Sequence, residues 1–327
     1  MLSSITHQFQ RLYERVLRRE IGSGPTHVAI IQDGNRRYAR KQGAAAPDGH
    51  REGANTSEQV LNWCEELGIE ALTLYAFSTE NFDRPADERE PLFDIIESKL
   101  YELADSDRVH DTGVCIRAIG DLTRLPERVQ TAISYAETRT RDYSQFQLNV
   151  ALAYGGRNEL LRAARGVVDR VDAGELSVDE IDVGTIEGQL YRQPIRDVDL
   201  IIRTGGDERT SNFLPWHANG NEAAVYFCAP YWPEFSKIDF LRGIRTYEAR
   251  EESWQQTKLE RALTVVRSLG DIELEIDDLQ ATVSRLRETL PEQDSHQLDA
   301  AVPVQRVGEP EGESTDVADD TETTPAD

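Results

Sequence analysis

The sequence predicts an α/β protein whose core is a mostly parallel, six-stranded sheet flanked by helices. Short apolar, β-branched runs recur along the chain, and amphipathic stretches of helical length separate most of them. Glycine or proline stands at many of the boundaries, where it ends one element before the next begins. Alternation of this kind is typical of βαβ units, in which helices cover a parallel sheet. The chain of 327 residues is long enough to bury a large core of this type.

The first part of the chain predicts three helices and two strands. Residues 1–20 carry apolar side chains at helical spacing, and a turn rich in glycine follows them. The β-branched run at 27–31 indicates a buried strand, and a short helix is expected over 36–42. After a loop of small residues, the segment 55–67 has an apolar face and stops before a glycine, as helices commonly do. A second buried strand is expected over 69–77.

The later elements continue the same alternation. Strands are expected over 114–119, 146–154, 199–203 and 223–228, and helices over 91–108, 126–140, 159–171 and 239–269. In open parallel sheets, ligands bind outside the carboxyl ends of the strands. The residues that directly follow each strand are therefore the first candidates for a functional site.

Charge divides the chain into two regions. The chain contains 60 acidic and 36 basic residues, which gives a net charge of -24. Residues 291–327 hold eleven acidic residues and one basic residue, so this segment alone contributes -10. It has few large apolar side chains, a composition typical of disorder. We predict a folded domain over 1–270 and an acidic C-terminal extension over 271–327, disordered from about 291.

The composition excludes several classes of protein. A chain this acidic lacks the basic surface that nucleic-acid binding needs. No apolar run is long enough to span a bilayer, and the N-terminus lacks the apolar core of a secretory signal, so we expect a cytoplasmic protein. The three cysteines are far apart in the sequence, which argues against a zinc site or a disulfide framework.

Lysine is rare among the basic residues. Lysine occurs at four positions, and the other basic residues are arginine. An acidic and lysine-poor composition favours a protein that works in concentrated salt, where the repulsion between like charges is screened. An acidic protein whose gene has a GC-rich codon bias would show the same composition.

The segment after the first predicted strand contains Asp33, Gly34, Asn35, Arg36 and Arg37. Glycine lets a ligand approach the backbone, a helix N-terminus attracts anions, and arginine binds phosphate through two parallel hydrogen bonds. An aspartate among such groups is typical of a Mg²⁺ bridge, because the metal ion binds carboxylate and phosphate oxygens together. Taken alone, such a segment is more often an aspartate that caps a helix beside solvent-exposed arginines.

Two other strand ends carry similar groups. The loop after the second predicted strand combines hydroxyl, carboxylate, amide, aromatic and guanidinium groups in Ser78, Thr79, Glu80, Asn81, Phe82 and Arg84. A double glycine after the fifth strand permits a tight turn, so that Arg203, Arg209 and Ser211 can converge on a phosphate. The alternative for the first segment is a polar turn closed by proline, which its density of functional groups disfavours, and the alternative for the second is an ordinary loop with surface arginines. Three such ends on one sheet edge indicate an anion-binding site.

Three further polar residues are candidates with weaker support. Glu222 precedes the sixth predicted strand, where a buried carboxylate would need a partner or a metal, although a solvent-exposed one is more common. His50 lies in the loop after the first motif, and His110 lies between a helix and the third strand. A lone histidine is more often structural than functional.

Several familiar signatures are absent. The chain has no GxxxxGK[ST] segment, and no GxGxxG follows the first strand, so a P-loop or a dinucleotide site is not expected. The aspartate-rich DDxxD repeat of all-helical prenyl synthases is also absent.

Six segments of the chain together resemble the cis-prenyltransferase family, which includes the undecaprenyl diphosphate synthases. They are HVAIIQDGNRRYARKQG (27–43), GHREGA (49–54), LTLYAFSTENFDRP (72–85), ALAYGGR (151–157), DLIIRTGGDERTSNF (199–213) and YWPEF (231–235). They stand in the expected order and extend over about residues 20–250. The resemblance implies the cis-prenyltransferase fold, with the catalytic domain over 1–270.

The resemblance also implies a reaction and its partners. An allylic diphosphate primer is elongated by units of isopentenyl diphosphate, in the presence of Mg²⁺, with new double bonds in cis. The implied assembly is a homodimer, with peripheral contact at the inner face of the membrane for product release. Because the salt-adapted composition suggests an archaeon, we expect geranylgeranyl diphosphate as primer and a polyprenyl diphosphate product, the precursor of a glycosyl carrier lipid.

Individual residues match positions of known role in the family that the chain resembles. Asp33 matches the catalytic aspartate that engages Mg²⁺, and Glu222 matches the second metal-associated carboxylate. Asn81 matches the position that assists proton removal from the incoming unit. The matches to substrate-binding positions are Gly34, Asn35, Arg36, Arg37, Tyr38, His50, Ser78, Thr79, Glu80, Phe82, Arg84, Arg203, Arg209, Thr210 and Ser211. An apolar tunnel for the product is expected between the sheet and the helix near 91–108.

The chain departs from the family pattern at Ala46, where bacterial members usually carry an arginine. This lowers the expected affinity for the primer diphosphate, and Arg36 offers a compensating charge. Two alternatives to the synthase remain. A non-catalytic partner subunit predicts a degraded Asp33-Gly34-Asn35 motif, which is intact here. A phosphate-ester hydrolase on the same type of sheet predicts phosphate release without isopentenyl diphosphate.

Overall fold

The computed structural model describes residues 12–191, 195–218, 223–270 and 284. The chain divides into two compact units, Met1–Glu252 and Ser253–Asp327, with the boundary inside the last helix. The first unit contains the sheet. The predicted acidic extension falls almost entirely outside the described residues, so its disorder and its predicted start at 271 stay predictions.

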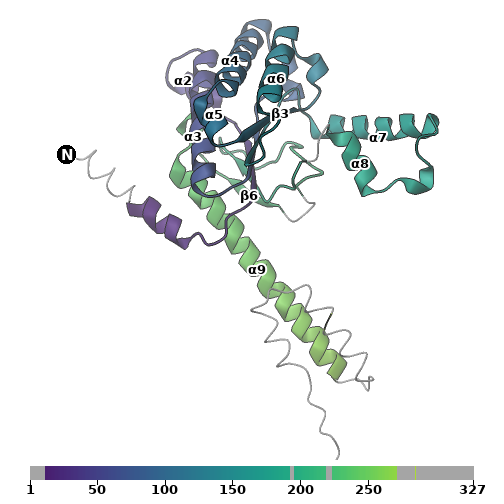
Figure 1. The fold of residues 1–327 in the computed structure, drawn as a ribbon. Coiled ribbons are helices and arrows are strands. Elements are labelled where there is room, and N and C mark those ends of the chain that lie inside the picture. The colour runs from purple at the N-terminus through teal and green to yellow at the C-terminus, as the bar shows by residue number, and fades with distance from the viewer. Residues whose placement is uncertain (1–11, 192–194, 219–222, 271–283, 285–327) are drawn as a thin grey trace, which may run out of the picture. The chain divides into compact units, whose positions relative to one another are not determined.

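All six strands of the sheet are parallel (Figure 1). They are β1 (His27–Ile31), β2 (Ala71–Tyr75), β3 (Val114–Ile119), β4 (Phe146–Ala151), β5 (Leu200–Arg203) and β6 (Ala224–Phe227). Their spatial order is β3-β4-β2-β1-β5-β6. The chain first builds the sheet on one side of β1 and then crosses to the other side, so β1 and β5 meet at a topological switch point. Such points are where ligands of open parallel sheets bind.

The register aligns the ends of the three central strands. Ile31, at the end of β1, pairs with Tyr75 at the end of β2 and with Arg203 at the end of β5. Every residue of β1 is buried, as expected for a parallel strand covered on both faces. The loops that carry the three predicted motifs therefore leave the sheet at the same level of one edge.

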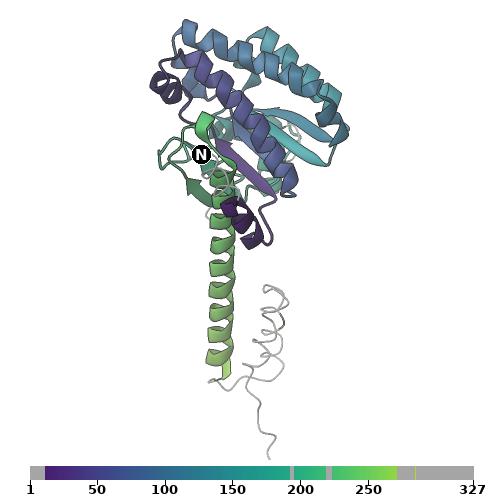
Figure 2. The ribbon, with the colours of Figure 1, turned by 90° about the vertical axis from the view of Figure 1, so that its left-hand side faces the viewer.

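Helices cover one face of the sheet. The described helices with both ends defined are α2 (Asn35–Lys41), α3 (Ala46–Glu66), α4 (Ala86–Ala104), α5 (Asp107–Asp111), α6 (Glu127–Thr140), α7 (Gly156–Asp172), α8 (Val183–Leu190) and α9 (Lys237–Gly270). Of these, α3, α4 and α6 form a layer over the strands (Figures 1 and 2). The larger apolar core lies between this layer and the sheet, and includes Val28, Val60, Leu72, Phe93 and Val129. Among the described residues, no helix is both long and apolar enough to cross a bilayer.

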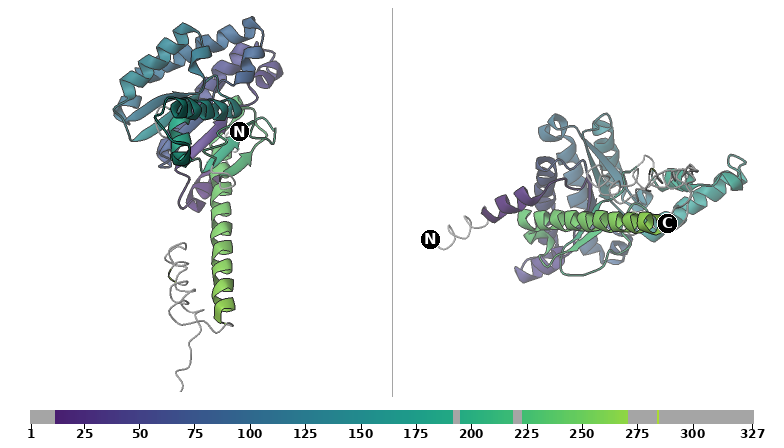
Figure 3. Two further views of the ribbon diagram at one scale, coloured as in Figure 1. Left: turned by 90° about the vertical axis from the view of Figure 1, so that its right-hand side faces the viewer. Right: turned by 90° about the horizontal axis from the view of Figure 1, so that it is seen from below.

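The opposite face of the sheet is covered mainly by the chain between α8 and β6. Ile31 and Ile201 pack there in a second core together with Phe213 and Leu214. Helices α7 and α8 pack against each other and lie nearest the viewer in the left panel of Figure 3. This pair and its connection leave several large apolar side chains exposed, namely Leu161, Val168, Val178, Ile181 and Val183.

The start of α3 differs from the prediction. The sequence predicts a loop before residue 55, with His50 inside it, whereas α3 begins at Ala46 and carries His50 in its second turn. The carboxylate of Asp48 accepts a hydrogen bond from the N–H of Ala45, which caps the first turn. The glycines taken as loop residues instead permit close helix packing, because a Cβ at Gly49 would lie 2.2 Å from a backbone oxygen of α2.

Other element boundaries differ from the prediction by smaller amounts. The predicted helix over 91–108 is two helices, α4 and α5, and α4 begins five residues earlier than predicted. The strands predicted over 69–77 and 146–154 are shorter, because the chain leaves the sheet after Tyr75 and after Ala151. The segment after Tyr75 forms one of the loops that line the cavity. Helix α8 was not predicted. Of the predicted N-terminal helix, residues 12–20 are described, and all are helical.

Candidate active site

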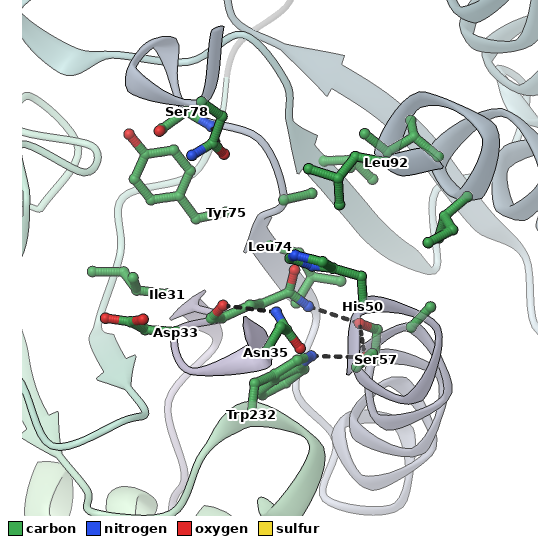
Figure 4. A pocket seen from close by; sticks show the side chains of 18 of the residues that line it. Ile31, Asp33, Asn35, His50, Ser57, Leu74, Tyr75, Ser78, Leu92 and Trp232 are labelled. Carbon is green, nitrogen blue, oxygen red and sulfur yellow. Dashed lines mark hydrogen bonds between the residues drawn. The ribbon is translucent and has the colours of Figure 1, made fainter. Parts of the chain in front are cut away.

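A cavity of about 640 Å³ opens where the ends of β1, β2 and β5 meet (Figure 4). Helices α3 and α4 form its walls, and β2 and β4 contribute to its floor. The two halves of the cavity differ in chemistry. The polar loops after the strands line one half, and aliphatic side chains line the other.

Asp33 and Arg203 stand at the centre of the polar half. One carboxylate oxygen of Asp33 accepts a hydrogen bond from the guanidinium of Arg203 at 2.7 Å, and the other lies 3.0 Å from the guanidinium of Arg37. The backbone of Asp33 is also held, because its carbonyl accepts hydrogen bonds from the Thr204 hydroxyl and from the backbone N–H of Trp232. These contacts hold the carboxylate at the cavity, where it is 29% exposed.

Gly34 allows the chain to turn from β1 into α2. Its φ is +106°, a conformation that side chains with a Cβ rarely adopt. A Cβ at this position would also lie 2.7 Å from the ring of Tyr231. The guanidinium of Arg37 lies over the same ring, with its carbon 5.3 Å from the ring centroid. The position therefore requires glycine for two independent reasons.

Arg203 organises the loop that follows β5. Its guanidinium donates to the Ser211 hydroxyl at 2.7 Å, to the Arg209 carbonyl at 2.6 Å and to the Asp207 carboxylate at 3.1 Å. Ser211 adopts a left-handed conformation with a φ of +51°. Because such strain persists where surrounding contacts enforce it, the side chain of Arg203 helps to define this loop.

A second group of nitrogen-bearing side chains, Arg36, His50 and Arg84, lies near the starts of α2, α3 and α4. Burial, together with the nearby Arg84 and Arg36, lowers the pKa of His50 to about 4. Burial and Arg36 also lower the pKa of Arg84. His50 Nε2 and one terminal nitrogen of Arg84 are buried and have no hydrogen-bond partner among the described residues. A bound anion would satisfy these donors and stabilise their charged forms.

The loop after β2 forms a short 3₁₀ helix over Thr79–Asp83. The amide oxygen of Asn81 accepts a hydrogen bond from the N–H of Ser78 at 3.0 Å, which closes the turn. Phe82 turns toward the core, where its ring centroid lies 5.0 Å from that of Phe77. The loop therefore offers Asn81 to the cavity and uses Phe82 as an anchor.

The apolar half lies where the sequence analysis expected a tunnel, between the sheet and the helix near 91–108. Leu74, Leu148 and Val150 of the sheet form its floor. The walls are Leu61 of α3 and, on α4, Leu92, Ile95, Ile96, Leu100 and Leu103. An apolar cavity at this place is confirmed.

Most of the predicted site residues come together. Those that line the cavity are Asp33, Asn35, Arg36, His50, Ser78, Glu80, Asn81, Arg84, Arg203, Arg209 and Ser211. Those that do not line it are Gly34, Arg37, Tyr38, Thr79, Phe82 and Thr210. Glu222 lies outside the described residues. Among the described residues, no three His, Cys, Asp or Glu side chains gather into a metal site.

Comparison with known sequences identifies the family. Residues 31–255 match the profile of the family described as putative undecaprenyl diphosphate synthase. This match spans more than half of the chain and includes every residue that lines the cavity. The chain belongs to the cis-prenyltransferase family.

Two curated relatives of this cis-prenyltransferase come from haloarchaea. The tritrans,polycis-undecaprenyl-diphosphate synthase (geranylgeranyl-diphosphate specific) of Halobacterium salinarum is 63% identical over 281 residues, which cover 86% of this chain and 92% of that protein. A protein of the same name from Haloarcula marismortui is 59% identical over 287 residues, covering 88% and 94%. These relatives support the predicted adaptation to salt.

A solved structure supports the fold. The crystal structure of lavandulyl diphosphate synthase from Lavandula x intermedia in complex with dimethylallyl diphosphate superposes with a TM-score of 0.64 and 36% identity. The alignment covers 69% of this chain and 95% of that chain. The predicted cis-prenyltransferase fold is confirmed.

Several residues that build the site of the cis-prenyltransferase are not among the predicted site residues. The indole N–H of Trp232 donates to the Gly53 carbonyl at 2.7 Å and ties the YWPEF segment to α3. Tyr75, whose ring stacks on Phe213 at 4.5 Å, lines the cavity at the end of β2. Tyr75 lies inside the strand predicted over 69–77, so the sequence pattern gave no signal for it. Gln32 donates to a serine of α3, and its position directly after the first predicted strand was an available signal.

Proposed function

We propose that this cis-prenyltransferase elongates geranylgeranyl diphosphate with isopentenyl diphosphate to give a long-chain polyprenyl diphosphate. One observation carries the proposal. Buried nitrogens of His50, Arg84 and Arg203 have no hydrogen-bond partner among the described residues, and all three residues line a cavity that continues into an aliphatic half. Unpaired guanidinium and imidazole nitrogens fit a diphosphate, and the aliphatic half fits a prenyl chain.

The site offers two places for a diphosphate. We assign the primer diphosphate to Arg36, His50 and Arg84, which stand at the mouth of the apolar half. We assign isopentenyl diphosphate to Arg209 and Ser211, with Arg203 between the two places. Binding two reactants side by side removes most of the entropy cost of their encounter.

The reaction breaks the allylic C–O bond of the primer and forms a C–C bond to the terminal carbon of isopentenyl diphosphate. The departing diphosphate takes the bonding electron pair, and the incoming unit loses a proton to restore a double bond. The guanidinium groups around the leaving diphosphate stabilise its growing charge. The amide of Asn81 orients the incoming unit, and the departing diphosphate accepts the proton, because an amide is a poor base.

Asp33 is the residue that would hold Mg²⁺. Its carboxylate faces the cavity between the two diphosphate places, and a single carboxylate with phosphate oxygens is a common donor set for Mg²⁺. Bound there, the ion would neutralise charge on the leaving diphosphate. Glu222 keeps its proposed role as the second carboxylate. Calorimetric titration of Mg²⁺ with a non-hydrolysable primer analogue, in wild type and in Asp33→Ala, tests this assignment.

Both haloarchaeal relatives are named as specific for geranylgeranyl diphosphate, and the proposed primer is taken from these names. The test compares geranylgeranyl and farnesyl diphosphate as primers with labelled isopentenyl diphosphate at high salt. We expect a higher kcat/KM with geranylgeranyl diphosphate. A clear preference for farnesyl diphosphate would exclude the proposed primer. The product is proposed to be the precursor of a glycosyl carrier lipid.

A product assay with the purified chain alone also distinguishes an enzyme from a non-catalytic partner subunit. A non-catalytic partner of a heteromeric synthase would form no product alone, whereas we expect product from the single purified chain. The intact Asp33 and its contacts with Arg203 and Arg37 favour catalysis. Phosphate release without isopentenyl diphosphate would indicate a hydrolase instead.

We propose a homodimer that forms through the α7–α8 pair. Leu161 and Val168 lie on the outer surface of α7 and are each 56% exposed, and Val183 of α8 is 64% exposed. Exposed apolar patches of this kind commonly mark interfaces. Light scattering should give twice the chain mass, and Leu161→Glu combined with Val168→Glu should reduce it to one chain mass.

We also propose that the chain works in the cytoplasm and contacts the inner face of the membrane when it releases its product. The helix over 12–20 exposes Leu12 and Val16 beside Arg15 and Arg19. A basic amphipathic face of this type binds anionic lipid surfaces. Co-sedimentation with anionic vesicles, which Leu12→Glu should reduce, tests this contact.

A further inference from the structure

Two charged side chains stand in the apolar half of the cavity. Among the described residues that line this half, Glu58 of α3 and Lys99 of α4 are the charged ones. The ammonium of Lys99 donates to Glu58 at 2.7 Å and to Glu102, on its own helix, at 2.6 Å. Glu58 and Lys99 therefore form a bridge between the two helices that wall the cavity.

The bridge lies toward the end of the cavity away from the diphosphate groups, and Leu61 of α3 and Leu103 of α4 line the cavity about one turn beyond it. Glu58 follows His50 by eight residues on α3, which corresponds to about 12 Å along the helix. Lys99 follows Leu92 by seven residues on α4, about 10 Å along that helix. The side chains of Lys99 and Glu58 are 28% and 44% exposed, so this end of the cavity borders solvent.

A long prenyl chain exceeds the space in the cavity. The volume of about 640 Å³ falls within the range of about 300–1,000 Å³ that holds drug-sized ligands. An undecaprenyl chain is larger than such a ligand, so part of it must leave the cavity before synthesis ends. The sheet closes the floor with continuous backbone hydrogen bonds between β2 and β4. The chain must therefore leave between the helices.

We propose that the Glu58–Lys99 bridge is the gate through which the growing chain leaves the cavity, and that it limits product length. This inference rests on the proposed synthase function. An apolar chain that reaches the bridge must separate or desolvate two opposite charges, which opposes its passage. A partly exposed ion pair is weak, so the bridge slows the chain without stopping it. Elongation of a chain that has reached the bridge therefore becomes slower relative to release of the product, and this limits the length of the product.

Matched substitutions on the two helices test the gate. Glu58→Met removes the partner on α3 and breaks the bridge, whereas Glu102→Met removes the partner on α4 and leaves the bridge in place. Full-length variants receive geranylgeranyl diphosphate, labelled isopentenyl diphosphate and Mg²⁺ at high salt, and the products are separated by length. We expect Glu58→Met to move the main product to longer chains by at least one isoprene unit. Glu102→Met should leave it unchanged.

Lys99→Met is a second, independent test of the gate, because it removes the cation of the bridge and should lengthen the product in the same way. Lys237→Met is the control for loss of a lysine, since Lys237 pairs with Glu66 outside the cavity. Unchanged product lengths in folded, active Glu58→Met and Lys99→Met would overturn the gate alone. Absence of any product from the wild type would overturn the proposed function and the gate together.

Discussion

The guanidinium of Arg203 lies 2.7 Å from the carboxylate of Asp33 and joins the end of β5 to the end of β1. Both residues stand between the two proposed diphosphate places. Since adjacent strands determine their separation, the two places are brought together by the sheet itself and not by flexible loops. Substitutions at either residue should therefore affect catalysis more than folding.

Replacing Asp33 with alanine should abolish measurable turnover, with a fall of at least about 10²–10³-fold. The proposed Mg²⁺ ligand is lost, while Arg203 keeps its contacts with Ser211 and Asp207. Steady-state assays with both substrates measure the loss, and far-ultraviolet circular dichroism checks the fold. Activity like that of the wild type would contradict the metal assignment.

Replacing Arg203 with lysine should raise the KM for isopentenyl diphosphate by about 10- to 100-fold, the loss expected for one or two hydrogen bonds to a charged group. A lysine ammonium cannot reproduce the planar guanidinium contacts with Asp33, Ser211 and the Arg209 carbonyl. Arg209→Lys is the matched control with a smaller expected effect, because the Arg209 side chain is 71% exposed. Equal KM values for the two variants would argue against this role.

Replacing Gly34 with alanine should lower activity strongly and destabilise the fold by at least about 1–3 kcal/mol. Alanine at position 34 would have to adopt a φ that is strained for a residue with a Cβ, and this Cβ would lie 2.7 Å from the Tyr231 ring. Gly43→Ala provides the comparison, because Gly43 also has a positive φ, and a Cβ added there would meet no atom of the described residues within 4 Å. Thermal melts and assays of both variants separate backbone strain from the contact with Tyr231. Equal effects would exclude the contact as a cause.

A buried carboxylate on α7 should make stability depend on pH. Glu159 accepts hydrogen bonds from the hydroxyls of Tyr154 and Tyr191 at one oxygen, and burial raises its pKa to about 7 from an ordinary value of 4.5. Between these values the folded chain keeps a proton that the unfolded chain has lost. The contribution of Glu159 to stability is therefore greatest below about pH 4.5 and falls as the pH rises to about 7.

Glu159→Gln removes this titration. Over the same pH window the wild type should lose up to about 3 kcal/mol relative to the variant, which follows from a shift of that size. Melting temperatures of both proteins measured from about pH 4.5 to 8 test the difference. Parallel curves would show that Glu159 does not titrate in this range.

Much of the sheet could be predicted from local patterns. Strands β1 and β3 have the predicted bounds, since a short run rich in valine and isoleucine is itself the signal for a strand of a parallel sheet. Because ligands of parallel sheets bind at the strand ends, the positions of Asp33, Asn81 and Arg203 after predicted strands correctly predict that they share one edge of the sheet. The start of α3 could not be predicted in this way, because Gly49 and Gly53 are unfavourable for an isolated helix and are required here by close packing on α2.

The sequence by itself determined the class of fold, the family and the edge of the sheet that carries the chemistry, because each depends on short patterns in the chain. The tertiary structure alone decided which side chains meet. It turned Phe82 into the core, joined Arg203 to Asp33, and placed Lys99 against Glu58 in an apolar wall. The last two contacts join residues that are far apart in the sequence. Their geometry follows from strand order and helix packing, which no local pattern encodes.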